Sequence, residues 1–143
     1  MATSTRGLAV DSNILISAAL GRRVRNIFRR FHGEITFWAP EACRRDARRR
    51  IPEICRKHGL DEKAALEFLD DVQKVVSFVG PVTYANQEQN ARERIQSRDP
   101  DDWPVLATAL ALDLPLWTED RDFFGCGVAT WITNNIEIYL RGN

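Results

Sequence analysis

The sequence has few of the features that mark secreted, membrane-spanning or disordered proteins. Its 143 residues include only three cysteines, which cannot all pair within one chain, and none of them belongs to a Cys-x-x-Cys pair. Free thiols in a reducing compartment are therefore expected. The longest stretches without charge, such as residues 123–136, are shorter than the roughly 20 residues that a membrane span requires. We expect no membrane segment.

The N-terminal apolar run and the charge balance exclude two further classes. Residues 8–20 are largely apolar, but Asp11 and Asn13 interrupt them, whereas a secretion signal needs uninterrupted hydrocarbon. A cytoplasmic protein is therefore expected. The 20 basic and 20 acidic side chains cancel, so the chain as a whole is not a polycation, and 44% hydrophobic residues suffice for a core. We expect one domain over residues 1–143.

The zero net charge conceals two segments of opposite sign. Residues 22–57 hold twelve basic and four acidic side chains, whereas residues 58–143 hold seven basic and fifteen acidic ones. Of the 20 basic residues 17 are arginine, whose planar guanidinium suits phosphate. A polyanion is one candidate partner of the basic segment. The alternative is a solvated helical face with local ion pairs, for which Asp46 with Arg49 and Arg50 has the right spacing.

Strand and helix patterns alternate along the chain. The expected strands are Gly7–Val10, Ile35–Ala39, Leu114–Thr118 and Val128–Thr133. The expected helices are one that contains residues 14–19, then Arg22–His32, Pro40–Lys57, an apolar stripe from Asp61 to Val76, Gln87–Ile95, Trp103–Asp113, and a last one opened by a capping box of Asn134 and Glu137. This order predicts an α/β fold in which helices cover both faces of a parallel sheet.

Acidic residues lie where such a sheet is expected to bind ligands. Asp11 follows the first strand, and Asp120 and Asp122 follow the strand at residues 114–118. Asp102 opens the helix at 103–113, and Asp46 lies in the helix after the second strand. Ligands of parallel sheets bind beyond the carboxyl ends of the strands, so these segments can converge on one cleft. Carboxylates about 4 Å apart repel by on the order of 4 kcal/mol at an effective dielectric of 20, and a cluster of them binds cations or takes up protons.

Each acid also has a purely structural interpretation. Asp11 and Asp102 can be helix caps, Asp120 and Asp122 can be turn residues, and Asp46 can be an ion-pair partner. None of these roles requires a ligand. Asp99 and Asp101 are interpreted mainly as solvated turn acids. The polar neighbour Asn13 favours a site at Asp11, whereas the flanking arginines make Asp46 the weakest candidate.

Four short motifs follow one another over nearly the whole chain. They are Asp11-Ser12-Asn13-Ile14-Leu15, then Ala39-Pro40-Glu41 leading to Asp46, then Asp99-Pro100-Asp101-Asp102 followed by Val105-Leu106-Ala107-Thr108-Ala109, and finally Thr118-Glu119-Asp120-Arg121-Asp122-Phe123. Together, in this order, they resemble the PIN-domain ribonucleases, and most closely the VapC-type toxins of bacterial and archaeal toxin–antitoxin modules.

The resemblance implies a set of metal-binding acids. Asp11, Asp102 and Asp120 match the family's first, third and fourth acids, and Asp122 would assist. Asp46 stands where the family usually has a glutamate, which is one methylene longer. The implied ion is Mg²⁺ or Mn²⁺, in agreement with the preference of hard divalent ions for oxygen ligands; zinc is not expected.

Further expectations follow from the same resemblance. Ser12 or Asn13, together with Thr118, would orient the first and fourth acids. The implied fold is a three-layer α/β/α sandwich around a parallel sheet. The implied partners are RNA, a second copy of the chain in a homodimer, and an antitoxin that blocks the cleft. The preference for RNA over DNA rests on this resemblance alone.

We therefore predict a metal-dependent endoribonuclease that leaves a 5′-phosphate and a 3′-hydroxyl. A divalent ion held by the acids would lower the pKa of a bound water. A group of arginines would hold flanking phosphates without reading sequence, namely Arg44, Arg45, Arg48 and Arg49.

Two other functions remain open. A phosphatase that works through an aspartyl phosphate would use Asp11 as its nucleophile. It is disfavoured because Asn13 replaces its second aspartate and no lysine follows a late strand. A non-catalytic PIN scaffold that only binds RNA or a protein is the second alternative, and Asp46 in place of glutamate is its best support.

Overall fold

Five parallel strands form the centre of the computed structural model, which describes residues 6–95 and 101–142. The strands are β1 (Arg6–Val10), β2 (Ile35–Pro40), β3 (Val76–Val79), β4 (Leu116–Trp117) and β5 (Thr130–Trp131). Their order across the sheet is β3-β2-β1-β4-β5, and every neighbouring pair is parallel. Because β1 and β4 are neighbours, the segments that follow Val10 and Trp117 leave the sheet side by side. The predicted parallel sheet is confirmed.

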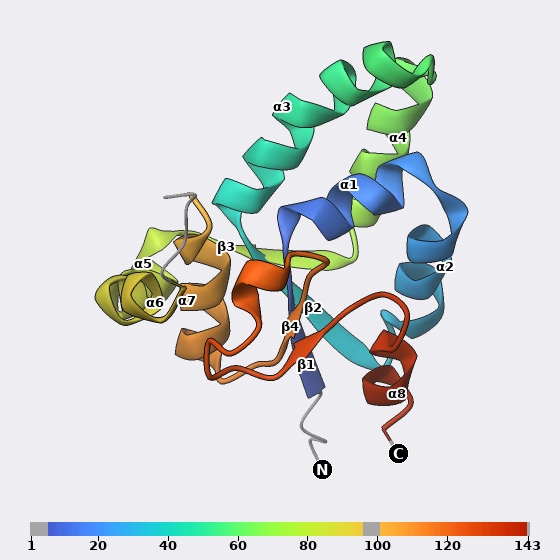
Figure 1. Cartoon of the computed structure of the whole chain (residues 1–143). Coiled ribbons are helices and arrows are strands. Elements are labelled where there is room, and N and C mark those ends of the chain that lie inside the picture. The colour runs from blue at the N-terminus through green and yellow to red at the C-terminus, as the bar shows by residue number, and fades with distance from the viewer. Residues whose placement is uncertain (1–5, 96–100, 143) are drawn as a thin grey trace.

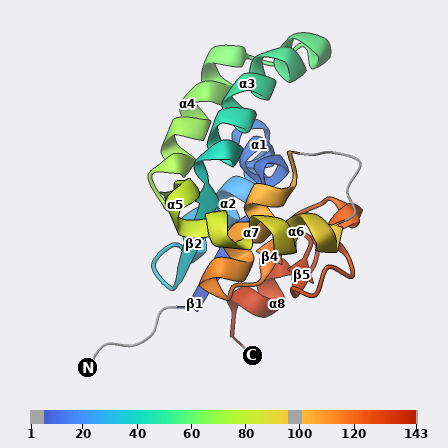
Figure 2. The same ribbon diagram turned by 90° about the vertical axis from the view of Figure 1, so that its left-hand side faces the viewer.

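Helices cover both faces of this sheet (Figure 1). They are α1 (Ser12–Leu20), α2 (Arg22–Phe31), α3 (Glu41–His58), α4 (Glu62–Gln73), α5 (Pro81–Tyr84), α6 (Glu88–Ile95), α7 (Trp103–Leu112) and α8 (Ile136–Leu140), with 3₁₀ turns at Ala85–Gln87 and Arg121–Phe123. In Figure 2, α5, α6 and α7 form one layer, and α1 to α4 lie on the other side of the sheet. The three-layer α/β/α sandwich is thus confirmed. Among the described helices we find none that combines the length and the apolar character of a membrane span.

The core consists of the buried strands and the inner faces of the helices. Phe28 of α2 packs against Phe37 of β2 and Trp117 of β4, with ring centroids 4.7 and 5.2 Å away. On the other face of the sheet, a Cβ atom at Gly7 would lie 2.6 Å from the side chain of Leu114, which would have to shift to make room for it. The three cysteines are buried and unpaired, as the sequence predicts.

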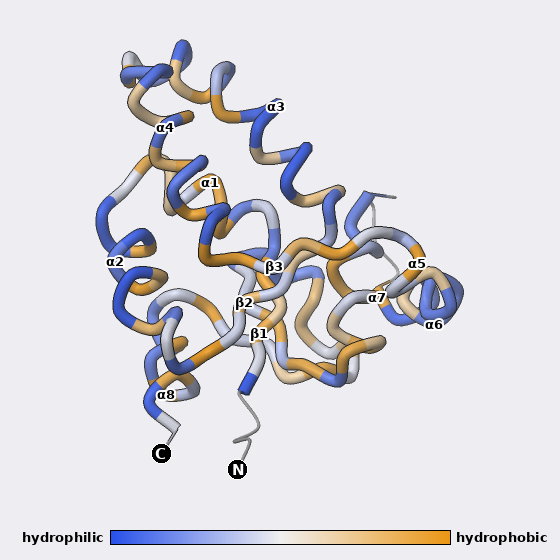
Figure 3. Tube along the Cα trace, turned by 180° about the vertical axis from the view of Figure 1, so that it is seen from behind, coloured by the Kyte–Doolittle hydropathy of each residue, from blue (hydrophilic) through white to orange (hydrophobic). Residues whose placement is uncertain are grey.

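Helices α3 and α4 form a hairpin that projects from the body of the molecule (Figure 1). A stripe of buried residues at helical spacing fixes the inner face of α3: Cys43, Ala47, Ile51 and Cys55. The helix ends at Gly59, whose φ of 66° is left-handed and therefore favours glycine. The outward faces of α3 are strongly hydrophilic (Figure 3), because they carry the arginine-rich part of the sequence.

Several elements differ from the sequence-based predictions: the end of α4, strand β3, helix α5, and the lengths of β4 and β5. The predicted helix through Val76 is wrong at its end, because α4 stops at Gln73 and Val76 begins β3. The spacing of Val72, Val75 and Val76 fits a continued helix, but parallel pairing with β2, which sets Phe78 opposite Ala39, determines the outcome. Helix α5 was not predicted at all, and β4 and β5 have two residues each instead of five or six.

The predicted capping box at the last helix is also wrong. Asn135, not Asn134, precedes α8, and it makes no capping hydrogen bond through its side chain. Instead, the side chain of Asn135 accepts a hydrogen bond from the Ile132 N–H at 3.1 Å. The side chain of Asn134 accepts one from Arg23 of α2 at 2.9 Å. A local hydrogen bond at Asn135 and a tertiary one at Asn134 therefore take the place of the capping box.

Candidate active site

The carboxyl ends of β1 and β4 hold Asp11 in a dense hydrogen-bond network. Asp11 caps α1, and its Oδ1 accepts the Ser12 N–H at 2.7 Å. Its Oδ2 accepts the Thr118 hydroxyl at 2.7 Å and the Asn13 side-chain amide at 3.1 Å. Thr118 directly follows β4, so the parallel pairing of the two strands brings it to Asp11. The structure thus places the three predicted orienting residues around this carboxylate.

Burial strongly affects the charge of this carboxylate. Asp11 is only 6% exposed, and desolvation by burial raises its pKa. The hydrogen bonds from Thr118 and Ser12 oppose this effect, whereas the nearby charges of Asp120 and Asp46 add to it, and the pKa remains raised overall. A cation beside Asp11 would relieve both the desolvation and the repulsion.

A trio of carboxylates has a geometry suited to one metal ion. Oxygens of Asp102, Asp120 and Asp122 all lie within 4.8 Å of one another. Asp120 accepts the Asp122 N–H at 2.9 Å, which closes the 3₁₀ turn after β4, and its own N–H donates to Thr118 Oγ1 at 3.0 Å. Asp102 directly precedes α7 and makes no capping bond through its side chain. The donor set consists of oxygen alone, so it fits Mg²⁺ or Mn²⁺.

A cleft of about 770 Å³ joins these acids. Its lining includes Asp11, Asp46, Asp102 and Asp120, so all four predicted catalytic acids face one space. Asp11 and Asp46 line this space without belonging to the trio of Asp102, Asp120 and Asp122. Asp101 is exposed and lies in a turn, as predicted, and it also lines the cleft. Asp99 lies outside the described residues.

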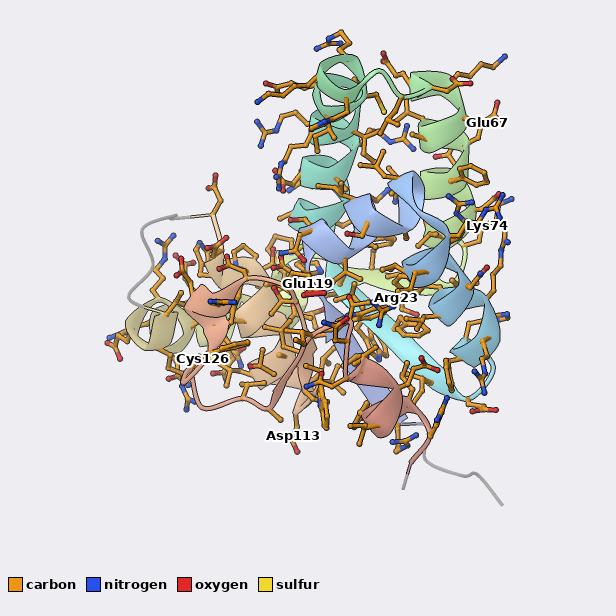
Figure 4. The ribbon with its side chains drawn as sticks, turned by 45° about the vertical axis from the view of Figure 1, so that its right-hand side comes forward. Arg23, Glu67, Lys74, Asp113, Glu119 and Cys126 are labelled. Carbon is orange, nitrogen blue, oxygen red and sulfur yellow. The ribbon has the colours of Figure 1, made fainter. Side chains whose placement is uncertain are left out.

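Glu119 is a cleft residue that the sequence analysis did not single out. Figure 4 shows it beside the beginning of α1. Its N–H donates to Asn13 Oδ1 at 3.3 Å, and its carboxylate accepts the Thr133 N–H at 2.9 Å. Glu119 therefore ties the two strand ends to the last loop. Its position between Thr118 and Asp120 is the sequence feature that could have identified it as a cleft residue.

The predicted arginines divide into two groups. Arg45 and Arg49 line the cleft, and so does Arg50, which was not predicted. Arg48 and Arg44 belong to other surroundings: Arg48 pairs with Asp70 of α4, and Arg44 pairs with Glu41 at 3.6 Å and lies over the ring of Phe78. The described lining of the cleft does not include these last two arginines.

Asp46 is engaged with the arginines of its own helix. It accepts hydrogen bonds from Arg49 at 2.7 Å and Arg50 at 3.4 Å, as the alternative interpretation of the basic segment predicts. Burial pushes its pKa upward, but hydrogen bonds from Arg49 and Ser12 and the charge of Arg50 hold the pKa below its ordinary value. Asp46 is therefore ionised and already balanced by positive charge, unlike Asp11.

The wall of the cleft on the α7 side is aromatic. Tyr84 of α5 and Trp103 of α7 both line it. The sequence analysis missed both residues as part of the site. Trp103 had a usable signal, because it follows Asp102 directly, whereas Tyr84 had none without a predicted α5.

The fold and the cleft define an α/β protein with a carboxylate cluster beyond the carboxyl ends of its parallel strands. A comparison with protein families gives this class a name. The family model described as PIN domain matches residues 9–141, and the chain therefore belongs to the PIN-domain family. A sequence comparison with curated proteins found no match.

Solved structures share this fold at low sequence identity. The chain is similar to PAE2754 from Pyrobaculum aerophilum, with a TM-score of 0.73 and 15% identity over 97% of this chain and 92% of that one. It is similar to VapBC2 from Rickettsia felis bound to a DNA fragment from their promoter, with a TM-score of 0.65 and 11% identity over 88% and 98%. It is also similar to FitAcB from Neisseria gonorrhoeae, with a TM-score of 0.58 and 17% identity over 88% and 97%. At these identities the likeness concerns the fold.

Proposed function

We propose that this PIN domain is a metal-dependent endoribonuclease of the VapC type, the toxin of a toxin–antitoxin pair. The observation that carries the proposal is the trio of Asp102, Asp120 and Asp122 at the edge of a cleft that also contains Asp11. Carboxylates this close to one another bind a cation or take up protons. The arginines of α3 in its lining give the same cleft an affinity for phosphate.

The residues of the cleft have different roles in the proposed reaction. Asp102, Asp120 and Asp122 would hold Mg²⁺ or Mn²⁺, with Asp11 facing the same space. Such an ion, when bound, lowers the pKa of a water and screens the charge of a phosphodiester. Thr118 holds Asp11 and Asp120 in fixed positions relative to each other, because its hydroxyl donates to Asp11 and accepts from the Asp120 N–H.

Phosphate binding falls to the arginines of α3. Arg45 lines the cleft, and Arg49 and Arg50 lie beside Asp46 in the same lining. Their guanidinium groups would position the strand on both sides of the scissile bond without reading its bases. In this proposal Asp46 chiefly orients Arg49 and Arg50.

A non-catalytic scaffold is the second candidate function. The ion pairs of Asp46 with Arg49 and Arg50 favour it, because they occupy the carboxylate that stands in place of the family's glutamate. Such a scaffold would bind RNA through the same arginines and leave it intact.

The proposal includes partners and a location. The structural neighbour from Rickettsia felis is a VapBC2 assembly, which supports a cognate antitoxin here. Such an antitoxin would place a basic side chain in the acidic cleft. We also propose that the domain forms a homodimer and acts in the cytoplasm, where buried unpaired cysteines stay reduced.

Cleavage of total cellular RNA tests the function. The wild type is compared with Asp11→Asn and with Asp113→Asn, each with Mn²⁺, with Mg²⁺ and with EDTA, and the cut ends are mapped. Asp113 is a matched control, because it is an exposed aspartate outside the lining of the cleft and far from Glu119 (Figure 4). Its φ of 55° is one that asparagine tolerates.

The nuclease predicts three results. The wild type and Asp113→Asn cleave RNA with either metal, EDTA abolishes cleavage, and Asp11→Asn reduces it by at least about 100-fold, the scale of a lost catalytic group. Equal cleavage by wild type and Asp11→Asn would contradict the assignment of the site. RNA binding without cleavage at any metal concentration would support the scaffold instead.

A further inference from the structure

We propose that Trp103 is a stacking platform for a base of the RNA strand in the cleft. This inference rests on the proposed RNA substrate and adds a base subsite to it. It also assigns a direction to the bound nucleotide, with its phosphate toward α3 and its base toward α7.

The two walls of the cleft have opposite chemistry. The α3 wall carries Arg45 and Arg49, and the α7 wall carries Trp103 and, from α5, Tyr84. A nucleotide has the same division, with a charged phosphate at one end and a flat apolar ring at the other. An inorganic phosphate would leave the aromatic residues unused.

Neighbouring side chains hold the indole of Trp103 in place. The guanidinium of Arg92 lies 4.9 Å from the ring centroid, and Glu88 accepts a hydrogen bond from Arg92 at 2.9 Å, which fixes the guanidinium. Tyr84 meets the indole edge to face, with centroids 5.6 Å apart and the rings at 64°. Arg92 is not among the described residues that line the cleft, so it supports the ring from outside. An aromatic surface held in this way loses little entropy when a base stacks on it.

The position of Trp103 next to Asp102 sets the register of the base. Consecutive Cα atoms are about 3.8 Å apart, so the platform begins one residue away from a candidate metal ligand. A phosphate bound at the acids therefore brings the base of an adjoining nucleotide to the indole. Stacking of this kind requires an unpaired base, because the bases of a duplex already stack on one another.

The test is an affinity cycle in the Asp11→Asn background, which removes cleavage from the measurement. Fluorescence anisotropy with Mg²⁺ gives the affinity for a labelled single-stranded RNA hexamer and for the same hexamer with all its bases removed. The proteins compared are Asp11→Asn alone and with Trp103→Leu, Trp103→Phe or Trp131→Phe. Leucine keeps an apolar side chain at the position but offers no ring. Trp131 is the control, because it packs against Tyr139 and is not part of the cleft lining.

The platform predicts a specific pattern of affinities. Trp103→Leu weakens binding of the intact hexamer by about 5- to 150-fold, the range measured for loss of one base–aromatic contact, and leaves the abasic hexamer unchanged. Trp103→Phe and Trp131→Phe stay within about threefold of the background protein. Thermal unfolding verifies that each variant is folded.

Two outcomes overturn the platform, and they differ from failure of the nuclease. If Trp103→Leu weakens the intact and the abasic hexamer equally, or neither of them, then Trp103 does not stack on a base, even where the wild type cleaves RNA. If the hexamer binds to none of the proteins, both the substrate and the platform are wrong. A protein that binds with the predicted pattern but cleaves nothing keeps the platform and loses the nuclease.

Discussion

Replacing Asp11 with asparagine should stabilise the metal-free protein while it removes the activity. Asp11 is a buried carboxylate whose pKa is raised, first by desolvation and further by the charges of Asp120 and Asp46. Its ionised form therefore opposes folding at neutral pH. Asparagine removes the charge and keeps an oxygen for the Ser12 N–H, which Asp11 accepts at 2.7 Å. The substitution therefore raises stability and lowers activity, a combination that is common when catalytic residues are replaced.

The expected magnitude is modest but measurable. Relief of such a strained site typically adds about 0.5–2 kcal/mol to the free energy of unfolding. For a chain of 143 residues this raises Tm by about 2–6 °C. In the wild type, Asn13 and Thr118 donate hydrogen bonds to Asp11 Oδ2. In Asp11→Asn these donors must turn away from the amide group at that position, which limits the gain in stability.

The dependence on pH identifies the cause. A carboxylate whose pKa is raised by folding stabilises the native state fully below its unfolded pKa of about 3.9 and loses this contribution as the pH rises through the folded pKa. The Tm difference between Asp11→Asn and the wild type should therefore be near zero at about pH 3 and grow toward neutral pH.

Thermal unfolding in EDTA over this pH range is the assay, with Asp113→Asn as the matched control. Added Mn²⁺ should raise the Tm of the wild type and raise that of Asp11→Asn less, because the variant keeps the trio of acids but lacks the charged carboxylate that faces the same space. An Asp11→Asn protein that is less stable than the wild type at pH 7 in EDTA would refute the reasoning. A Tm gap that does not change with pH would refute it equally.

Three further substitutions test other contacts. Thr118→Val removes the hydroxyl that donates to Asp11 at 2.7 Å, and it should cost about 1–3 kcal/mol and most of the RNA cleavage, measured by chemical unfolding and a cleavage assay. Asp46→Asn should lower the free energy of unfolding by at most about 1 kcal/mol at pH 7, because the ion pairs of Asp46 are partly exposed. Since folding lowers the pKa of Asp46, this loss of stability should fade as the pH falls through that pKa. Arg6→Leu should lower stability by about 1–3 kcal/mol without affecting cleavage, because Arg6 bonds the last turn of α8 and lies 4.8 Å from the ring of Tyr139.

The acids could be predicted from the sequence because their positions follow from topology. Once β1 and β4 are recognised as parallel strands, Asp11 and Asp120 must leave the same edge of the sheet, whichever side chains pack below them. The alternation of strands and helices is visible in the apolar pattern, so the layers could be predicted as well. The orienting role of Thr118 was implied by the family resemblance, and the structure places its hydroxyl between the two acids.

The faces of α3 and the aromatic wall could not be predicted in the same way. Six arginines between residues 44 and 56 surround one helix, and only the phase of its buried stripe decides which of them face the cleft. That stripe contains Cys43 and Ala47, small residues that the apolar pattern marks weakly. Tyr84 reaches the cleft through β3 and α5, two short elements whose local sequence resembles a continued helix and a turn. Their conformation depends on pairing with β2, which is a tertiary interaction.

The charges of the cleft are compatible with the proposed RNA substrate, although the net charge of the chain is zero. An acidic floor alone would repel a polyanion, and metal ions screen only the phosphates that they touch. The arginines of α3 add positive charge to the lining of the cleft, and Asp46 keeps Arg49 and Arg50 aligned until phosphate competes for them. In the proposed function, Asp120 after β4 and Asp102 before α7 bind the cation, whereas the arginines that bind phosphate belong to α3. This separation allows both charges to stay close without cancelling.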